Sequence, residues 1–174
     1  MLITPTALPE VLLIEPKKFE DLRGWFIETF RKDFLEDAVG HSINFCQDNL
    51  VKSYYGAIRG LHYQMPPFAQ SKLVSVLKGS VLDIVVDIRK GAPNFGKHYA
   101  VELSAENQKQ LFIPRGFAHG YACLSETALL AYKVDSFYNK AAEASIAFDD
   151  PQLNIDWQIP LEKQFLSPKD REHP

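Results

Sequence analysis

The chain has 174 residues, 46% hydrophobic and 24% charged, with a net charge of −3. These values are typical of one globular domain, long enough to bury about 70% of its unfolded surface, and they argue against a general nucleic-acid binder. The N-terminus lacks the basic and long apolar segments of a signal peptide, and no stretch approaches a membrane span. Cys46 and Cys123, each among apolar neighbours, predict reduced and buried thiols. We expect a single domain over residues 1–174, cytoplasmic, with no nucleic-acid or membrane partner.

Short elements are predicted in the N-terminal part of the chain. They are a strand at 11–15, a turn at 19–24, a strand at 25–30 and an amphipathic helix at 31–39 with Phe34 and Leu35 inward, closed by Gly40. Alternation along the strand at 25–30 places Phe26 and Glu28 on one side. A glutamate between aromatic residues could contact a ligand or could be an edge-strand charge that blocks aggregation.

Two amides, Gln47 and Asn49, share one strand face if that segment is extended. Such a pair can recognise a nucleobase or sugar edge, although turn formation is a commoner reason for these residue types.

The most polar strand in the chain lies between 58 and 64 and ends at Pro66 and Pro67. Alternation predicts Arg59 and Tyr63 on one face and His62 and Gln64 on the other. A neutral imidazole suits proton transfer near pH 7, and nearby cations suit an anionic substrate or an oxyanion. A core histidine among surface cations is the alternative, but so many polar groups on one apolar strand favour a site.

The second half of the chain consists of short β-branched and apolar runs separated by Gly and Pro turns. We predict that 72–78 and 81–89 form a hairpin about Gly79 and Ser80, and that 117–124 pairs with 128–134. The pattern indicates an all-β fold, for which we favour a jelly roll with short helices and an irregular C-terminal tail.

Metal, nucleophilic and nucleotide-cofactor chemistry have little support in the residues. The segment around His62 supplies one histidine where a metal-binding cupin needs more ligands, and Gln64 is a poor substitute. The chain has no Gly-x-Ser-x-Gly elbow, no Gly-x-Gly-x-x-Gly and no phosphate-binding Walker loop.

Acid–base chemistry is what these side chains permit. The candidates are His62, Lys72, His119, Tyr132 and Asp170. A histidine base and a tyrosine acid on opposite faces of a carbon next to a carbonyl can invert its configuration, with a lysine stabilising the enolate. By default, Tyr132 in ALLAYKV would be a core aromatic residue.

Long motifs in a fixed order resemble the dTDP-4-dehydrorhamnose 3,5-epimerases. They are FEDLRGWFIETF at 19–30, QDN at 47–49, RGLHYQMPPFAQSKLV at 59–74, VDIRKGAPNFG at 86–96, IPRGFAHGY at 113–121, YKVDSFY at 132–138, DDPQLNIDW at 149–157 and LSPKD at 166–170. The resemblance covers nearly the whole chain and implies a cupin-type double-stranded β-helix (jelly roll) that acts as a homodimer without metal or cofactor.

The resemblance also implies a role for particular residues. His62 matches the base, Asp170 the carboxylate that orients it, Tyr132 the acid, and Lys72 the group near the keto oxygen. Substrate contacts are implied for Arg23, Phe26, Glu28, Gln47, Asn49, Arg59, Lys72, His119, Tyr138, Glu143 and Lys169, some of them reaching the partner subunit's site.

The implied reaction is epimerisation of dTDP-4-dehydro-6-deoxy-D-glucose at C3 and C5, which makes dTDP-4-dehydro-L-rhamnose. The open alternatives are epimerisation at only one of these carbons, movement of the keto group between C3 and C4, a non-catalytic sugar-nucleotide-binding module, and a metal-dependent cupin oxygenase.

Overall fold

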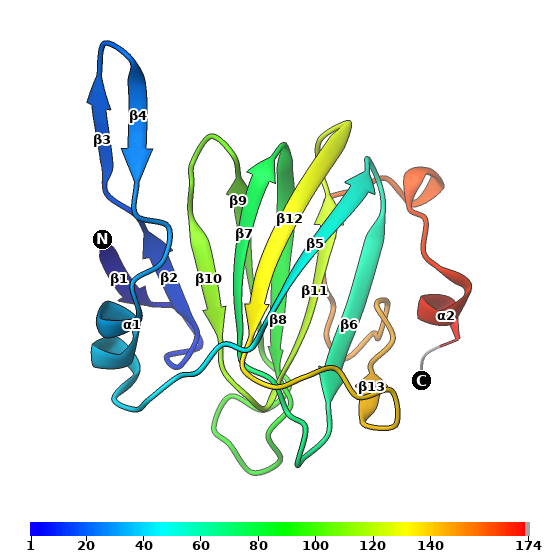
Figure 1. The fold of residues 1–174 in the computed structure, drawn as a ribbon. Helices are drawn as coiled ribbons and strands as arrows, with labels where there is room; N and C mark the ends of the chain where they lie inside the picture. The colour runs from blue at the N-terminus through cyan, green and yellow to red at the C-terminus, as the bar shows by residue number, and fades with distance from the viewer. Residues whose placement is uncertain (173–174) are drawn as a thin grey trace.

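Two antiparallel β-sheets face each other in the computed structural model of the protein, which describes residues 1–172 (Figure 1). The six-stranded sheet has the order β1 (Leu2–Pro5), β2 (Leu12–Glu15), β10 (Gln110–Ile113), β7 (Lys72–Lys78), β12 (Thr127–Val134) and β5 (Gln47–Tyr54). The five-stranded sheet has the order β13 (Glu143–Ser145), β6 (Ile58–Gln64), β11 (Phe117–Cys123), β8 (Ser80–Asp87) and β9 (His98–Ser104). The predicted jelly-roll fold is confirmed.

Consecutive strands often join different sheets, so two predicted pairings are wrong. Strand β7 pairs with β10 and β12, whereas β8 pairs with β9 and β11. Likewise, β11 pairs with β6 and β8, while β12 pairs with β5 and β7. At the first corner Gly79 has φ +71°, and a Cβ there would lie 2.2 Å from Ser125 Oγ. The Gly-Ser turn that suggests a hairpin therefore carries the chain from one sheet to the other.

Side chains from the two sheets form the central core between them. Fully buried members include Val74, Val85, Leu103 and Leu111. Side chains of β8 alternate between two clusters, because Val81 and Val85 face this core while Leu82, Ile84 and Val86 pack in a second cluster with the C-terminal tail. Cys123 is buried in the central core as predicted, but Cys46 is exposed, which corrects the prediction for that thiol.

The N-terminal region adds a two-stranded hairpin and a helix to the six-stranded sheet. The hairpin, β3 (Lys18–Asp21) and β4 (Gly24–Ile27), projects away from the two sheets (Figure 1). The predicted turn at 19–24 is thus mostly strand, and the predicted strand at 25–30 ends at Ile27. Helix α1 (Lys32–Val39) buries Leu35 and ends at Gly40 as expected, but Phe34 is exposed and lies under the Arg31 guanidinium.

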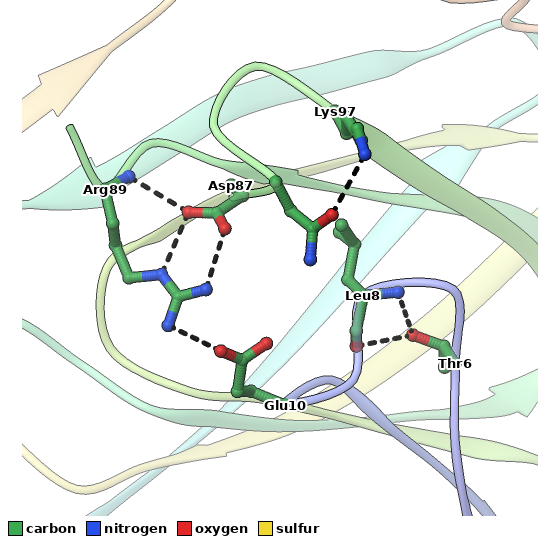
Figure 2. Close-up of polar contacts among 7 residues, drawn as sticks. Thr6, Leu8, Glu10, Asp87, Arg89 and Lys97 are labelled. Atoms are coloured by element: carbon green, nitrogen blue, oxygen red, sulfur yellow. Dashed lines mark hydrogen bonds and ion pairs between the residues drawn. The ribbon is translucent and has the colours of Figure 1, made fainter. Parts of the chain in front are cut away.

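The loop before β2 is held to the base of the five-stranded sheet by Arg89 (Figure 2). Its guanidinium donates to both carboxylate oxygens of Asp87 and forms a 3.0 Å ion pair with Glu10. The C-terminal tail carries a 3-10 turn (Leu161–Lys163) and the short helix α2 (Pro168–Arg171). No helix within residues 1–172 has the length and apolar character required to span a bilayer.

Candidate active site

A cavity of about 140 Å³ lies between the two sheets. It is lined by Val51 of β5, Arg59 and His62 of β6, Lys72 of β7, His119 and Tyr121 of β11, and Leu130 and Tyr132 of β12. Five residues proposed from the sequence therefore line one space, although they are spread over four strands. We call this space the catalytic cavity.

Arg59 and His62 line the same cavity, which corrects the prediction that they lie on opposite faces. The register between β6 and β11 shifts between the pairs His119–His62 and Tyr121–Arg59. The strands approach so closely there that a Cβ on Gly60, which has φ +127°, would lie 2.6 Å from Gly120 Cα. This irregularity interrupts the two-residue alternation and places both side chains inward.

A contact between His62 and Asp170 joins the barrel to the C-terminal tail at this site. His62 Nε2 lies 2.6 Å from Asp170 Oδ1, and Asp170 is only 5% exposed. Asp170 lies in α2, whose first turn is capped by the Ser167 hydroxyl accepting from Asp170 N at 3.1 Å. When Asp170 accepts the Nε2 proton, the basic lone pair of the neutral imidazole lies on Nδ1.

Lys72 is an unusually acidic lysine. Burial lowers the pKa of Lys72 to about 8, and the carboxylates of Asp83 and Glu143 oppose that shift. At neutral pH the amine is therefore largely an ammonium group, able to donate hydrogen bonds into the cavity it lines.

Tyr132 contributes a protonated phenol to the same cavity. Burial raises the pKa of Tyr132, with Arg59 acting in the opposite direction. The hydroxyl therefore keeps its proton at neutral pH and can act as a proton donor.

Two buried groups that the sequence reasoning left unassigned support the cavity wall. Asp83, fully buried in β8, has both carboxylate oxygens 3.0 Å from His119 Nε2. Arg59 Nε donates to Ser53 Oγ at 3.1 Å, and Ser53 Oγ lies 2.9 Å from the Tyr121 hydroxyl. An aspartate inside the apolar run VLDIVVDI was the available signal for Asp83, since a buried carboxylate needs a partner.

Five further predicted residues form a connected polar group, which we call the rim. Gln47 Nε2 donates to Asn49 Oδ1 at 2.8 Å, and Tyr138 N donates to Gln47 Oε1 at 3.4 Å. The Tyr138 hydroxyl donates to Glu143 Oε2 at 2.8 Å, and Lys169 Nζ lies 2.5 Å from the same oxygen. Burial alone would raise the pKa of Glu143, but Lys169 and Tyr138 lower it, so this carboxyl is charged at neutral pH.

The remaining three predicted residues do not line the catalytic cavity of their own chain. Arg23 and Phe26 are on the exposed β3–β4 hairpin, where Arg23 forms a 2.6 Å ion pair with Asp21. Glu28 follows the hairpin, and its Oε1 lies 3.8 Å from Arg31 Nη1. The hairpin thus carries Arg23 and Phe26 away from the two sheets (Figure 1).

Within residues 1–172, no three His, Cys, Asp or Glu side chains gather as a possible metal-ligand set. What the cavity does combine is a His–Asp pair, a protonated phenol and an ammonium group. Fold and site together define a jelly-roll protein whose cavity is equipped for acid–base chemistry. The family model described as dTDP-4-dehydrorhamnose 3,5-epimerase matches residues 5–174, and the chain belongs to that family.

Individual relatives agree with this assignment over most of their length. The chain is 49% identical over 170 residues to a dTDP-4-dehydrorhamnose 3,5-epimerase of Shigella flexneri, covering 98% of this chain and 93% of the relative. A crystal structure of the enzyme of that name from Elizabethkingia anophelis superposes with a TM-score of 0.97 at 49% identity, covering 100% of this chain and 95% of the other. The structure of a dTDP-6-deoxy-D-glucose-3,5-epimerase from Legionella pneumophila, solved with dTDP-4-keto-L-rhamnose, superposes with a TM-score of 0.92 at 48% identity. The match covers 97% of this chain and 89% of the other.

Proposed function

We propose that the protein epimerises dTDP-4-dehydro-6-deoxy-D-glucose at C3 and C5 to give dTDP-4-dehydro-L-rhamnose. The observation that carries the proposal is that His62, Lys72 and Tyr132 line one cavity inside a fold of this family. The bound dTDP-4-keto-L-rhamnose of the Legionella pneumophila relative has the chemistry of the proposed product.

The C4 ketone of the substrate acidifies the hydrogens on its two neighbouring carbons. His62 removes one of these protons, and Asp170, which accepts the other ring N–H, stabilises the imidazolium that forms. The electron pair of the broken C–H bond moves into an enolate, whose oxygen is stabilised by the Lys72 ammonium group.

Inversion requires that the proton return to the opposite face of the same carbon. Tyr132 donates it, directly or through a water molecule. His62 then releases its proton to solvent and Tyr132 regains one, which restores both groups. The same cycle at the second carbon completes the reaction, with no net change in the number of atoms or electrons. The proposed chemistry needs no metal or cofactor.

The rim and the hairpin provide the proposed contacts to the nucleotide and diphosphate. Arg59 and His119 hold the substrate near the reacting sugar, and the rim residues Gln47, Asn49, Tyr138, Glu143 and Lys169 extend this surface. The hairpin residues Arg23 and Phe26, together with Glu28, complete a site in a second copy, because they lie away from their own cavity.

A homodimer is the assembly that we propose from this division of residues. A groove of about 390 Å³ on the outer face of the six-stranded sheet is lined by Phe30, Leu50, Leu77 and Gln110 among others. Leu50 is 64% and Leu77 58% exposed, and the buried Gln110 Oε1 has no hydrogen-bond partner among the described residues. A second copy seated on this face would cover the apolar side chains and bring its hairpin towards the neighbouring site. We further propose that residues 1–174 act as one domain and that the enzyme works in the cytoplasm.

Solvent exchange measured by NMR tests the proposed reaction. The protein is incubated in heavy water with dTDP-4-dehydro-6-deoxy-D-glucose, and deuterium is followed at each carbon. Incorporation at C3 and C5 with formation of the L-rhamno product is the expected result. Incorporation at one carbon would assign a mono-epimerase, whereas binding without exchange would leave a sugar-nucleotide-binding module.

A further inference from the structure

A second and larger cavity lies at the base of the barrel, at the end where β6 and β8 finish. Its volume is about 840 Å³, and its walls are the loop after β6, the segment 88–90 after β8 and the segment 115–117 before β11. We call it the basal cavity. It shares one lining residue, Lys72, with the catalytic cavity, and its other lining residues are different.

The charged side chains that line the basal cavity are all cationic. They are Lys72, Arg89, Lys90 and Arg115, and no aspartate or glutamate is among the described residues of its lining. The neutral polar side chains of the lining are Tyr63, Gln64 and Gln70, but the Gln64 amide already donates to Phe68 O and Phe137 O and accepts from Asn139 N. A lining of this kind attracts anions and disfavours cations.

Two of these cations are held in place by carboxylates outside the cavity lining. Arg89 is fixed by Asp87, which is fully buried, and by Glu10, as Figure 2 shows, and its guanidinium carbon lies 4.4 Å from the centre of the Phe117 ring. Arg115 Nη2 lies 3.1 Å from Asp135 Oδ2. The carboxylates offset part of the positive charge, but each guanidinium keeps N–H groups beyond those engaged in these contacts.

Lys90 supplies a charge that no carboxylate offsets. It is exposed, and within residues 1–172 it takes part in no ion pair. A flexible ammonium group beside fixed guanidinium groups is an arrangement that can close on a small anion after it enters.

The rest of the lining is mostly apolar and includes Met65, Pro66, Pro67, Ile88 and Phe117. A free inorganic ion would leave this surface unused, whereas a ligand with a flat apolar body would bury it. We propose that the basal cavity is a second ligand site, which binds a small amphipathic anion with one phosphate or carboxylate group on an apolar body.

Binding of phenyl phosphate, measured by isothermal titration calorimetry on the purified full-length protein, tests the proposal. We expect one phenyl phosphate per chain, bound more tightly than inorganic phosphate because only the former fills the apolar wall. Lys90→Glu should weaken the binding of phenyl phosphate by about tenfold or more, because it reverses the charge that no carboxylate offsets. Equal affinity for the two probes would overturn the amphipathic assignment.

Two control variants separate the basal cavity from general charge and from the catalytic cavity. Lys97→Glu makes the same charge change at an exposed lysine that does not line the basal cavity, and Arg59→Gln removes the guanidinium of the catalytic cavity. Both should bind phenyl phosphate as the unmodified protein does. The proposal would be overturned if Lys97→Glu and Lys90→Glu lowered the affinity for phenyl phosphate equally. It would also be overturned if Arg59→Gln lowered this affinity while Lys90→Glu did not. These measurements do not require the epimerase reaction, so the two proposals can fail independently.

Discussion

His62 and Asp170 are 108 residues apart in the chain, yet His62 Nε2 lies 2.6 Å from Asp170 Oδ1. The tail of the protein thus supplies the carboxylate partner of a histidine on β6. In the proposed mechanism this contact sets the tautomer of the base and stabilises its charged form.

His62→Ala should lower turnover by at least about 10²-fold, as removal of a general base does. Asp170→Asn should lower turnover less, because the imidazole stays but its charged form loses a carboxylate. Initial rates with the 4-keto sugar nucleotide check both, and His41→Ala, at an exposed histidine, is the matched control. Near-normal turnover in His62→Ala would refute the assignment.

Tyr132→Phe should separate the two halves of the reaction. Proton removal by His62 needs no phenol, so deuterium should still enter the substrate from heavy water, while net epimerisation falls because the opposite face loses its proton donor. Tyr54→Phe, at an exposed tyrosine of the same sheet, should change neither assay. If Tyr132→Phe lowers exchange and epimerisation equally, Tyr132 is not the acid.

Turnover should decline as pH rises through about 8, because that is the pKa to which burial lowers Lys72. Below this pH the amine is an ammonium group that stabilises an enolate, and above it the amine is neutral. A pH–rate profile of the unmodified protein measures this decline in turnover on the alkaline side. Lys72→Met should lose most of the activity at every pH. An alkaline limb far above this pKa would contradict the assignment.

Lys72→Met should also stabilise the fold at neutral pH. A lysine whose pKa is lower in the folded than in the unfolded chain makes an unfavourable contribution while both forms are protonated. That contribution diminishes only as pH rises from about 8 towards the unfolded value. The gain in free energy of unfolding should be only about 1–2 kcal/mol, because the substitution also removes a favourable partner of Asp83 and Glu143. Urea unfolding at pH 7 measures it, with Lys78→Met at the exposed end of β7 as control.

Ser167→Ala should lower turnover several-fold although Ser167 is outside the cavity. Its hydroxyl caps α2 by accepting from Asp170 N at 3.1 Å, and loss of such a cap weakens a helix terminus by about 1 kcal/mol. Asp170 would then meet His62 less often, so kcat should fall more than KM rises. Ser167→Thr keeps a capping oxygen and should restore activity. A threonine variant as slow as the alanine variant would contradict the capping role.

Mixing two inactive variants tests whether the hairpin acts on the partner's site. His62→Ala removes the base, and the double variant Arg23→Ala/Phe26→Ala removes the hairpin contacts. Random re-association should restore about a quarter of normal activity, because half of the dimers are mixed and each holds one intact site. Mixtures that stay inactive would place the hairpin contacts on their own chain.

Much of the fold and site could be read from the sequence because strand alternation and motif order are local properties. The alternating run of β8, the Gly40 helix end and the family motifs around His62, His119 and Tyr132 required no coordinates. Each depends on residues close together in the chain, where backbone periodicity and turn chemistry act directly.

Only the tertiary structure decided which strands pair and which side chains share a space. The Gly-Ser corner between β7 and β8 looks like a hairpin turn, but packing of Gly79 against Ser125 directs the two strands into different sheets. Arg59 joins His62 in one cavity because the register with β11 shifts between them. These outcomes depend on contacts between distant segments, and a local sequence pattern does not specify which distant segment packs against it.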